Sequence, residues 1–267
     1  MRIMMVCGDH ARHRFVLNKL AERFDLCGVL IQKREPIVPI PTDELTPQDR
    51  SNFIRHFGER EVTERQIFGN PSWCVDQKLE MDFQCLDQSE ALQFVRNLKP
   101  DAALVFGTGL LGPELLAKLP PHTLNLHLGL SPRYRGAATL FWPFYFLEPA
   151  WAGATFHYLV SEPDAGDVVH QVCPPLHRSD GIHDVGCRTV VVAAEEAVLL
   201  FERLEQTEKW ERKRQKGTGK NFLVRDFHAQ HLRVVYDLYE NKLVQAFLDG
   251  ELPDRRPVLF RQPGCGK

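Results

Sequence analysis

The first half of the chain alternates short apolar runs with segments of helical periodicity, and this alternation limits the fold more than any other feature. An apolar run from Arg2 to Cys7 is followed by a polar loop, by apolar residues at helical spacing, and by a second run from Leu26 to Ile31. Strand, loop, helix and strand in this order favour a parallel sheet that binds ligands at the carboxyl ends of its strands. Further strands are expected at 102–106 and 123–127.

The pattern weakens between residues 36 and 90, where a loop with three prolines precedes a polar, charge-mixed helix. We interpret this region as a surface excursion. Regular elements resume with a helix at 89–98. A hairpin of strands at 153–160 and 167–173 follows, and then a long helix at 190–204.

The composition changes towards the C-terminus. A basic run at 209–220 is interpreted as a solvated linker, followed by a strand at 221–224, an amphipathic helix at 229–248 and a loosely ordered end rich in Pro and Gly. We therefore expect an α/β fold with a Rossmann-like, mostly parallel sheet and helices on both faces. The catalytic domain is predicted at 1–208, with a linker and a small α/β extension at 209–267.

Composition excludes several classes of protein. With 43% apolar residues in 267, the chain can bury a globular core, and a net charge of -2 provides no general attraction for nucleic acid. Seven scattered cysteines without a CxxC pair and the lack of a long apolar stretch predict a cytoplasmic protein with no membrane span. No metal site is expected, because the central histidines lie on different predicted elements: His157, His170, His177 and His183.

The segment from Asn125 to Gly136, NLHLGLSPRYRG, carries the strongest chemical signal. Residues two apart in a strand point to the same face, so Asn125 and His127 present an amide and an imidazole side by side. This pair can hold and protonate a developing oxyanion, although the spacing alone favours an ordinary structural pair. Asp164 lies between two predicted strands, where a carboxylate serves either a turn or a reaction.

Together these residues resemble the formyltetrahydrofolate-dependent formyltransferases. Their pattern is Asn-Ile-His-x-Ser-Leu-Leu-Pro-x-Tyr-Arg-Gly followed by Asp-x-Gly, which NLHLGLSPRYRG and DAGDVVHQ match here. The resemblance implies an enzyme that moves a formyl group from N10-formyltetrahydrofolate to an amine. Asn125 and His127 would stabilise the formyl oxygen and Asp164 would help to move the proton. In one departure, Gly129 and Ser131 replace the Ser and the second Leu of the pattern.

The same resemblance places the folate co-substrate beside a glycine-containing loop and beside the loop before Asp164. Two glycines let the main chain approach a pterin closely, although such glycines also simply end strands. The implied folate-binding residues are Gly107, Thr108, Gly109, Leu110, Leu111, Ser161, Glu162 and Pro163.

Contacts with the amine acceptor are less sharply indicated. Asp9 and His10 lie on the first loop, at the expected ligand side of the sheet, where polar residues need no special role. Arg133 and Arg135 match phosphate oxygens by their fork geometry, and an ordinary solvated turn explains them equally well. The aromatic run at 141–146 is interpreted as helix packing in preference to base stacking.

The acceptor is expected to be a small-molecule amine. Methionyl-tRNA formyltransferases continue into a longer C-terminal β-barrel, whereas the extension here has the pattern of one strand and one helix, so nucleic acid is not an expected partner. By analogy we favour a nucleotide-linked amino sugar, with hydroxyornithine, glycinamide ribonucleotide and methionyl-tRNA as alternatives. A homodimer is expected on the same ground.

Two hypotheses belong to other classes. An NAD-dependent oxidoreductase would explain the alternating strands and helices, but the GxGxxG spacing is missing after Gly8. A non-catalytic ligand-binding module would keep a pocket and lose the chemistry, which the retained Asn125, His127 and Asp164 argue against.

Overall fold

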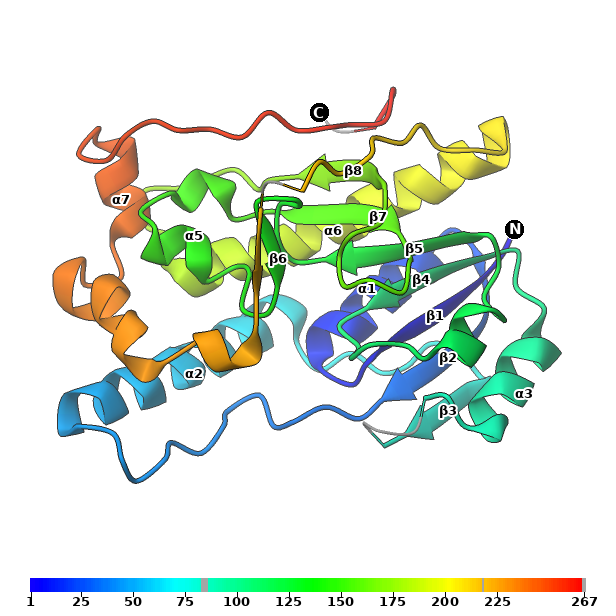
Figure 1. Ribbon diagram of the computed structural model, residues 1–267, viewed down its shortest axis with the longest axis horizontal. Helices are drawn as coiled ribbons and strands as arrows, with labels where there is room; N and C mark the ends of the chain where they lie inside the picture. The colour runs from blue at the N-terminus through cyan, green and yellow to red at the C-terminus, as the bar shows by residue number, and fades with distance from the viewer. Residues whose placement is uncertain (83–85, 218, 266–267) are drawn as a thin grey trace.

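The apolar runs form one sheet in a computed structural model that describes residues 1–82, 86–217 and 219–265. The strand order is β3-β2-β1-β4-β5-β7-β8 (Figure 1). The first five strands of this order, from β3 to β5, are parallel to one another. Strands β7 and β8 form an antiparallel hairpin, and β7 pairs antiparallel with β5. The strands are β1 (Arg2–Gly8), β2 (Asp25–Gln32), β3 (Lys78–Met81), β4 (Ala102–Phe106), β5 (His122–His127), β7 (Ala154–Tyr158) and β8 (Val168–Val172).

Helices cover both faces of the sheet, as predicted. On one face α1 (Ala11–Ala21) and α6 (Ile182–Thr207) share a core with every second residue of β1. On the other face α3 (Ser89–Leu98) and α4 (Pro113–Leu116) pack against the intervening residues. Because both faces are buried, the central strands carry continuous apolar runs in place of alternation. The Rossmann-like, mostly parallel architecture is confirmed.

The interpretation of residues 36–90 as a surface excursion is confirmed for the loop at 36–46, where no residue is buried, and is wrong for the helix and the strand that follow. Helix α2 (Pro47–Phe68) packs against α1 and α6, and it buries several polar side chains. Asp49, for example, lies fully buried against Arg233, with both guanidinium contacts at 2.7 Å. Buried polar side chains that find partners do not produce an apolar stripe, which is why the helix looked like a solvated one. Part of the predicted excursion, residues 83–85, lies outside the described residues.

A second, smaller core joins the middle of the chain to its C-terminal part. Strand β6 (Tyr134–Gly136) pairs in parallel with β9 (Lys220–Phe222), and the short helix α5 (Trp142–Tyr145) packs beside them. Trp142 stacks on Phe222 with ring centroids 4.6 Å apart. Helix packing of the aromatic run is confirmed. The division into 1–208 and 209–267 stays a prediction.

A continuous helix at 229–248 was predicted, and this prediction is wrong. The segment forms a 3-10 turn (Ala229–His231), a π-helical turn (Val234–Leu238) and α7 (Leu243–Leu248). Glu240 and Asn241 interrupt it in the left-handed region, with φ values of 49° and 62°. The break has a structural use, because Asn241 Oδ1 accepts the Ile182 N–H at 3.0 Å and so caps the first turn of α6.

The expectation of a loosely ordered end is also wrong for the described residues. The chain from about residue 258 to Cys265 runs beside β8 (Figure 1). The Gln171 N–H donates to the Phe260 carbonyl at 2.8 Å, and Gln262 is 1% exposed. The terminal segment therefore covers the edge of the sheet.

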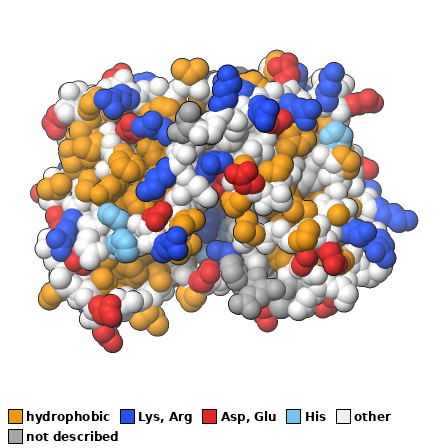
Figure 2. Space-filling view, in the orientation of Figure 1, with side chains coloured by type: hydrophobic (Ala, Val, Ile, Leu, Met, Phe, Trp, Pro, Cys, Tyr) orange, Lys and Arg blue, Asp and Glu red, His pale blue; other side chains and the backbone are white. Residues whose placement is uncertain are grey.

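Surface charge is mixed on the face shown in Figure 2, where hydrophobic side chains also gather over α5 and α7. Two smaller 3-10 turns, Pro149–Trp151 and Val224–Asp226, complete the elements of this side. Across residues 1–82, 86–217 and 219–265, no helix is both long enough and apolar enough to span a membrane. The six described cysteines carry free thiols, and Cys85 lies outside the described residues.

Candidate active site

The sheet brings the predicted trio together at the carboxyl end of β5. Asn125 and His127 lie two residues apart on that strand, and Asp164 lies in the loop between β7 and β8. Asp164 Oδ1 is 3.3 Å from Nδ1 of His127 and accepts from Nδ2 of Asn125 at 3.3 Å. The Asp164 backbone has a φ of 48°, a left-handed conformation that is uncommon outside glycine and often marks a functional loop.

A fourth side chain, His157, completes the cluster. The pairing of β5 with β7 places His157 directly opposite Asn125. Asn125 Nδ2 lies 3.0 Å from Nε2 of His157, and that nitrogen lies 3.5 Å from Asp164 Oδ1. The Gly136 N–H donates to the other oxygen of Asp164 at 2.9 Å, so both carboxylate oxygens are engaged.

The His127 ring is fixed on its far side by the main chain. Nε2 of His127 lies 2.9 Å from the Tyr134 carbonyl oxygen, which can only accept, so this nitrogen carries a proton. Gly129 leaves room for the ring, because a Cβ atom at residue 129 would lie 2.5 Å from Nε2. The glycine that departs from the family pattern is therefore required by the position of His127.

Charge in the cluster is set by burial and by these contacts. Burial lowers the pKa of His127 below 6.5, and the facing Asp164 carboxylate and the Tyr134 carbonyl oppose that shift. Burial raises the pKa of Asp164, but His127, His157 and the Gly136 N–H outweigh it and bring the value to about 2. Asp164 is therefore ionised at neutral pH.

The displaced serine does not replace a hydrogen bond of the loop. Ser131 Oγ is buried and has no hydrogen-bond partner within the described part of the chain. Thr155 ties the loop together instead, because its hydroxyl donates to the Gly129 carbonyl at 2.7 Å and accepts the Ser131 N–H at 3.0 Å. Gln171 holds the Ser131 carbonyl at 2.7 Å.

A residue of the basic run, Gln215, also holds the cluster. Its Nε2 donates to the carbonyl oxygens of Asp164 and Gly166, both at 2.7 Å. The adjoining chain pairs Lys213 with Val168 of β8. The solvated-linker interpretation is therefore incomplete, since this segment restrains the loop that carries Asp164.

The predicted folate residues lie on two loops beside the trio. Gly107 has a φ of 69°, and the His13 ring fills the space of its absent Cβ at 2.2 Å. Gly109 donates its N–H to Gln32 at 2.7 Å, and Leu110 is 73% exposed at the carboxyl end of β4. Thr108 and Leu111 are half-buried in the same loop, whereas Ser161 and Glu162 are exposed and Pro163 is half-buried just before Asp164.

The four predicted acceptor residues lie in two groups, one after β1 and one at β6. Asp9 accepts the Arg34 N–H at 3.1 Å, and His10 Nε2 contacts the Glu35 carbonyl at 3.0 Å, both beyond β1. Arg133 is paired with Glu148 at 2.8 Å. Arg135 approaches Glu162 at 3.9 Å, and its charge acts on His127, so it lies nearest the trio.

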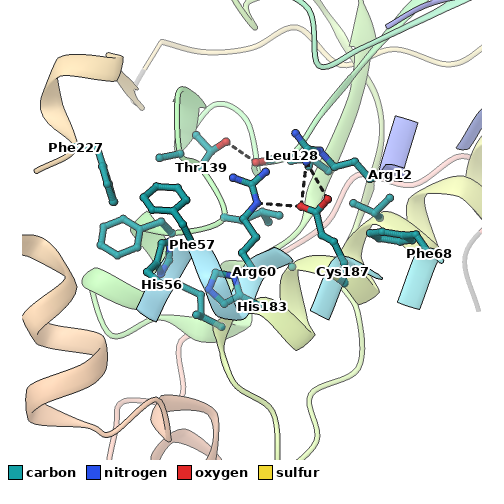
Figure 3. A pocket seen from close by; sticks show the side chains of 17 residues that line it. Arg12, His56, Phe57, Arg60, Phe68, Leu128, Thr139, His183, Cys187 and Phe227 are labelled. Carbon is teal, nitrogen blue, oxygen red and sulfur yellow. Dashed lines mark hydrogen bonds and ion pairs between the residues drawn. The ribbon is translucent and has the colours of Figure 1, made fainter. Parts of the chain in front are cut away.

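A cavity of about 310 Å³ is lined by α1, α2, α6 and the chain after β5, including Leu128, which follows His127 (Figure 3). Arg12 and Phe68 lie on one side, Phe57 and Phe227 on the other, and Arg60 between them. Of the described residues, no group of three or more His, Cys, Asp or Glu side chains is placed to hold a metal ion.

The sequence provided no indication of the residues that line the cavity. It also did not indicate that His157 and Gln215 contact the trio. Arg60 and Glu64 have the spacing of an ordinary surface ion pair on a helix. The sequence places His157 on a predicted strand as an isolated histidine, and only the register of the hairpin reveals that it faces Asn125. Gln215 stands in a basic run with no motif of its own.

The fold and the cluster define an α/β protein with polar side chains at the carboxyl ends of its strands, where open sheets of this kind bind ligands. Residues 55–202, more than half of the chain, match the Formyl transferase family, and the chain belongs to that family. The matched segment contains Asn125, His127 and Asp164.

Individual relatives agree with this assignment. Methionyl-tRNA formyltransferase of Koribacter versatilis is 34% identical over 109 residues, which cover 40% of this chain and 35% of that protein. The chain thus spans about a third of the length of this curated relative. A sugar N-formyltransferase from a Shewanella species has the same fold, with a TM-score of 0.55, 14% identity, and 88% and 87% of the two chains covered.

A formyltransferase of Anoxybacillus kamchatkensis, solved with a UDP-linked formamido sugar and tetrahydrofolate, also shares the fold. Its TM-score is 0.50 at 13% identity, with 92% of this chain and 97% of that chain covered. At these identities the likeness to the two solved structures concerns the fold alone.

Proposed function

We propose that this protein transfers a formyl group from N10-formyltetrahydrofolate to the amine of a small molecule. The observation that carries the proposal is the cluster of Asn125, His127 and Asp164 at the carboxyl end of β5, with contacts of 3.3 Å between the carboxylate and both partners. An amide, an imidazole and an ionised carboxylate in one cluster are the groups that acyl transfer to an amine requires.

Each residue has a distinct part in this reaction. Asn125 donates a hydrogen bond to the formyl oxygen, where negative charge develops as the amine attacks. His127 donates to the same oxygen from Nδ1 when that nitrogen is protonated, because its Nε2–H already contacts the Tyr134 carbonyl oxygen. Asp164 is ionised, since its pKa is about 2, and it helps to move the proton that the attacking amine loses to N10 of the folate, which departs as the bond between N10 and the formyl carbon breaks. The resting contacts of Asp164 are long, at 3.3 to 3.5 Å, so they can give way to substrate atoms.

The folate supplies the activated formyl group, and the loops at the carboxyl ends of β4 and β7 fit it. Leu110 offers an exposed apolar side chain in the loop after β4. Leu111 and Leu159, at the bases of the two loops, pack against the same core layer. Residues 107–111 and 161–163 are the proposed folate site.

Among acceptors we favour a nucleotide-linked amino sugar. The Anoxybacillus formyltransferase with this fold was solved with a UDP-linked formamido sugar. The other acceptors named above, including methionyl-tRNA, stay open as alternatives. Activity in the cytoplasm and as a homodimer also stays a prediction.

A transfer assay tests the proposal directly. The protein is incubated with formyl-labelled N10-formyltetrahydrofolate and with UDP-linked and dTDP-linked amino sugars, hydroxyornithine, glycinamide ribonucleotide and tRNA in separate reactions. We expect labelled product from an amino-sugar nucleotide. Product from tRNA alone would reverse the order of acceptors, and the absence of labelled product from a folded protein across the whole panel would contradict formyl transfer to these amines.

A further inference from the structure

Two arginines share one carboxylate in the wall of the cavity. Arg12 Nη1 donates to both oxygens of Glu64, at 3.0 and 3.1 Å, and Arg60 Nε donates to one of them at 2.9 Å. Among the described residues, Glu64 is the only acidic side chain that pairs with either arginine. The group therefore carries one uncompensated positive charge in a largely buried place.

The uncompensated charge affects the pKa of Arg12. Burial, with the nearby Arg60 charge, lowers the pKa of Arg12 to about 10, so both guanidinium groups remain protonated at neutral pH. The pKa values of His56 and His183 are lowered by burial, so these rings are neutral and do not change the balance. A buried positive excess of this kind is relieved by an anion.

Donor groups remain available to such an anion. The hydrogen bonds to Glu64 use Nη1 of Arg12 and Nε of Arg60, whereas each guanidinium has five N–H donors. In Figure 3 the guanidinium of Arg60 points along the cavity towards Leu128 and Thr139, away from the helix that carries it. Planar forks of this kind match phosphate oxygens.

The opposite side of the cavity is aromatic. Phe57, Phe141 and Phe227 line it, and the rings of Phe141 and Phe227 lie 5.0 Å apart, edge to face. His56 adds a neutral ring, 5.1 Å from that of Phe57. Aromatic walls favour a flat group such as a nucleobase, because its face can stack on the rings.

The cavity adjoins the proposed catalytic residues. Leu128, which lines it, directly follows His127, and Thr139 Oγ1 donates to the Leu128 carbonyl. A Cβ atom at Gly129 would touch both Thr139 and the His127 ring. Thr139, which lines the cavity, therefore lies close to the imidazole.

We propose that this cavity binds the acceptor through a phosphate group seated on Arg12 and Arg60, with the flat base of a nucleoside diphosphate against the aromatic side. The identity of the ligand as acceptor rests on the proposed function, whereas the binding of a phosphate-bearing molecule does not. Glu64 holds the two forks in place and is a positioning residue.

Isothermal titration with uridine diphosphate, without folate, tests the site. We expect saturable binding to the wild-type protein and at least about 10-fold weaker binding to Arg60→Gln, because charge-assisted hydrogen bonds to phosphate are lost. Arg65→Gln is the matched control, since Arg65 lies on the same helix, pairs with Glu61 and is 75% exposed. Its affinity should equal that of the wild type.

Two further probes separate the contribution of the phosphate from that of the base. Ribose 5-phosphate should bind more weakly than uridine diphosphate, because it lacks a base, and uridine should be insensitive to Arg60→Gln. If Arg60→Gln does not fold, Arg60→Lys keeps the charge without the fork and should still weaken uridine diphosphate several-fold.

The proposal is overturned if the wild type does not bind uridine diphosphate, or if these Arg60 variants bind it as well as the wild type. Binding without formyl transfer to any amine would leave the site in place and refute the function. Transfer to an amino-sugar nucleotide with a KM unchanged by Arg60→Gln would refute the site alone.

Discussion

Nδ1 of His127 lies 3.3 Å from Oδ1 of Asp164, while Nε2 of the same ring faces the Tyr134 carbonyl oxygen at 2.9 Å. Both ring nitrogens thus meet oxygen atoms that accept hydrogen bonds. The ionised carboxylate opposes the effect of burial, which lowers the pKa of this histidine. The pair is therefore arranged to gain and lose one proton at a fixed place.

Removal of the carboxylate charge should abolish most of the transfer. In Asp164→Asn the cluster keeps its shape but loses the proton acceptor, so kcat should fall by about 10² to 10⁴ while the protein remains folded. His127→Ala should have an effect of similar size. Asp167→Asn, three residues away and paired with Arg212 at 3.7 Å, serves as the control with unchanged kcat. A single-turnover formyl-transfer assay measures the change, and near-wild-type kcat in Asp164→Asn would exclude this role.

A methyl group at residue 129 should displace the imidazole. In Gly129→Ala the added Cβ would lie 2.5 Å from His127 Nε2 and 2.7 Å from the Tyr134 carbonyl oxygen, so the ring must move. We expect kcat to fall by about 10-fold or more, because small misplacements of catalytic groups are costly. Gly58→Ala is the matched substitution, since it meets no atom within 4 Å on α2 and should stabilise the helix by about 0.5–1 kcal/mol. Equal kcat for Gly129→Ala and the wild type would show that the glycine is not needed.

The segment after α6 should act on catalysis through Gln215. Gln215→Ala removes both hydrogen bonds to the carbonyls of Asp164 and Gly166, so the loop loses its restraint and kcat should drop about 5- to 50-fold. Gln215→Asn keeps the amide on a shorter side chain and so tests whether the amide must reach both carbonyl oxygens. Gln206→Ala, at an exposed residue, is the control. Because Asp164 would no longer be fixed, the pH profile of kcat should broaden or shift. A loss of stability with an unchanged kcat would assign Gln215 a structural role only.

The sheet could be predicted from sequence because its strands are buried on both faces, so runs such as Arg2 to Cys7 leave little choice of element. The trio was predictable for a related reason, since Asn125 and His127 must share a face once 122–127 is a strand. The hairpin of β7 and β8 then places Asp164 in the loop that joins these two strands.

The cavity and the restraints were not predictable, because they depend on contacts between distant segments. Arg60 and Glu64 are separated by one helical turn, and their partner Arg12 lies more than forty residues earlier in the chain. Buried polar groups of this kind leave no periodic pattern, whereas burial of apolar groups does. The order of the terminal segment could not be predicted for the same reason, since Gln262 there contacts Val169 of β8, Arg203 of α6 and Glu211.

Stability should fall with acid through His183. Burial, followed by the Arg60 charge, lowers its pKa from 6.5 to about 3, so the folded state keeps the ring neutral. A depressed pKa means that stability is complete above about pH 6.5 and is lost as the pH falls towards 3, since only the unfolded chain gains a proton. The free energy of unfolding should be about 2 kcal/mol lower at pH 5 than at pH 8 from this group alone.

Urea unfolding of His183→Gln at both pH values measures that contribution. The difference between pH 8 and pH 5 should shrink by roughly 2 kcal/mol relative to the wild type. The same substitution at exposed His228 controls for the loss of an imidazole. An identical pH dependence in His183→Gln and the wild type would show that the ring takes up a proton in the folded protein.

Gln262 should anchor the terminal segment with a single side chain. Its Nε2 donates to the carbonyls of Val169 and Glu211, both at 2.7 Å, and its Oε1 accepts from the Glu211 N–H at 3.0 Å. In Gln262→Ala the buried Val169 carbonyl and the partly buried main-chain groups of Glu211 lose their partners, so the free energy of unfolding should fall by about 2–4 kcal/mol. Gln230→Ala, at an exposed residue, is the control and should change the free energy of unfolding by less than about 0.5 kcal/mol.

Hydrogen exchange adds a local test of the same contact. The Gln171 N–H, which donates to the Phe260 carbonyl, should exchange faster in Gln262→Ala because the edge of β8 is then uncovered. Unchanged protection there would mean that the terminal segment is held by its other contacts.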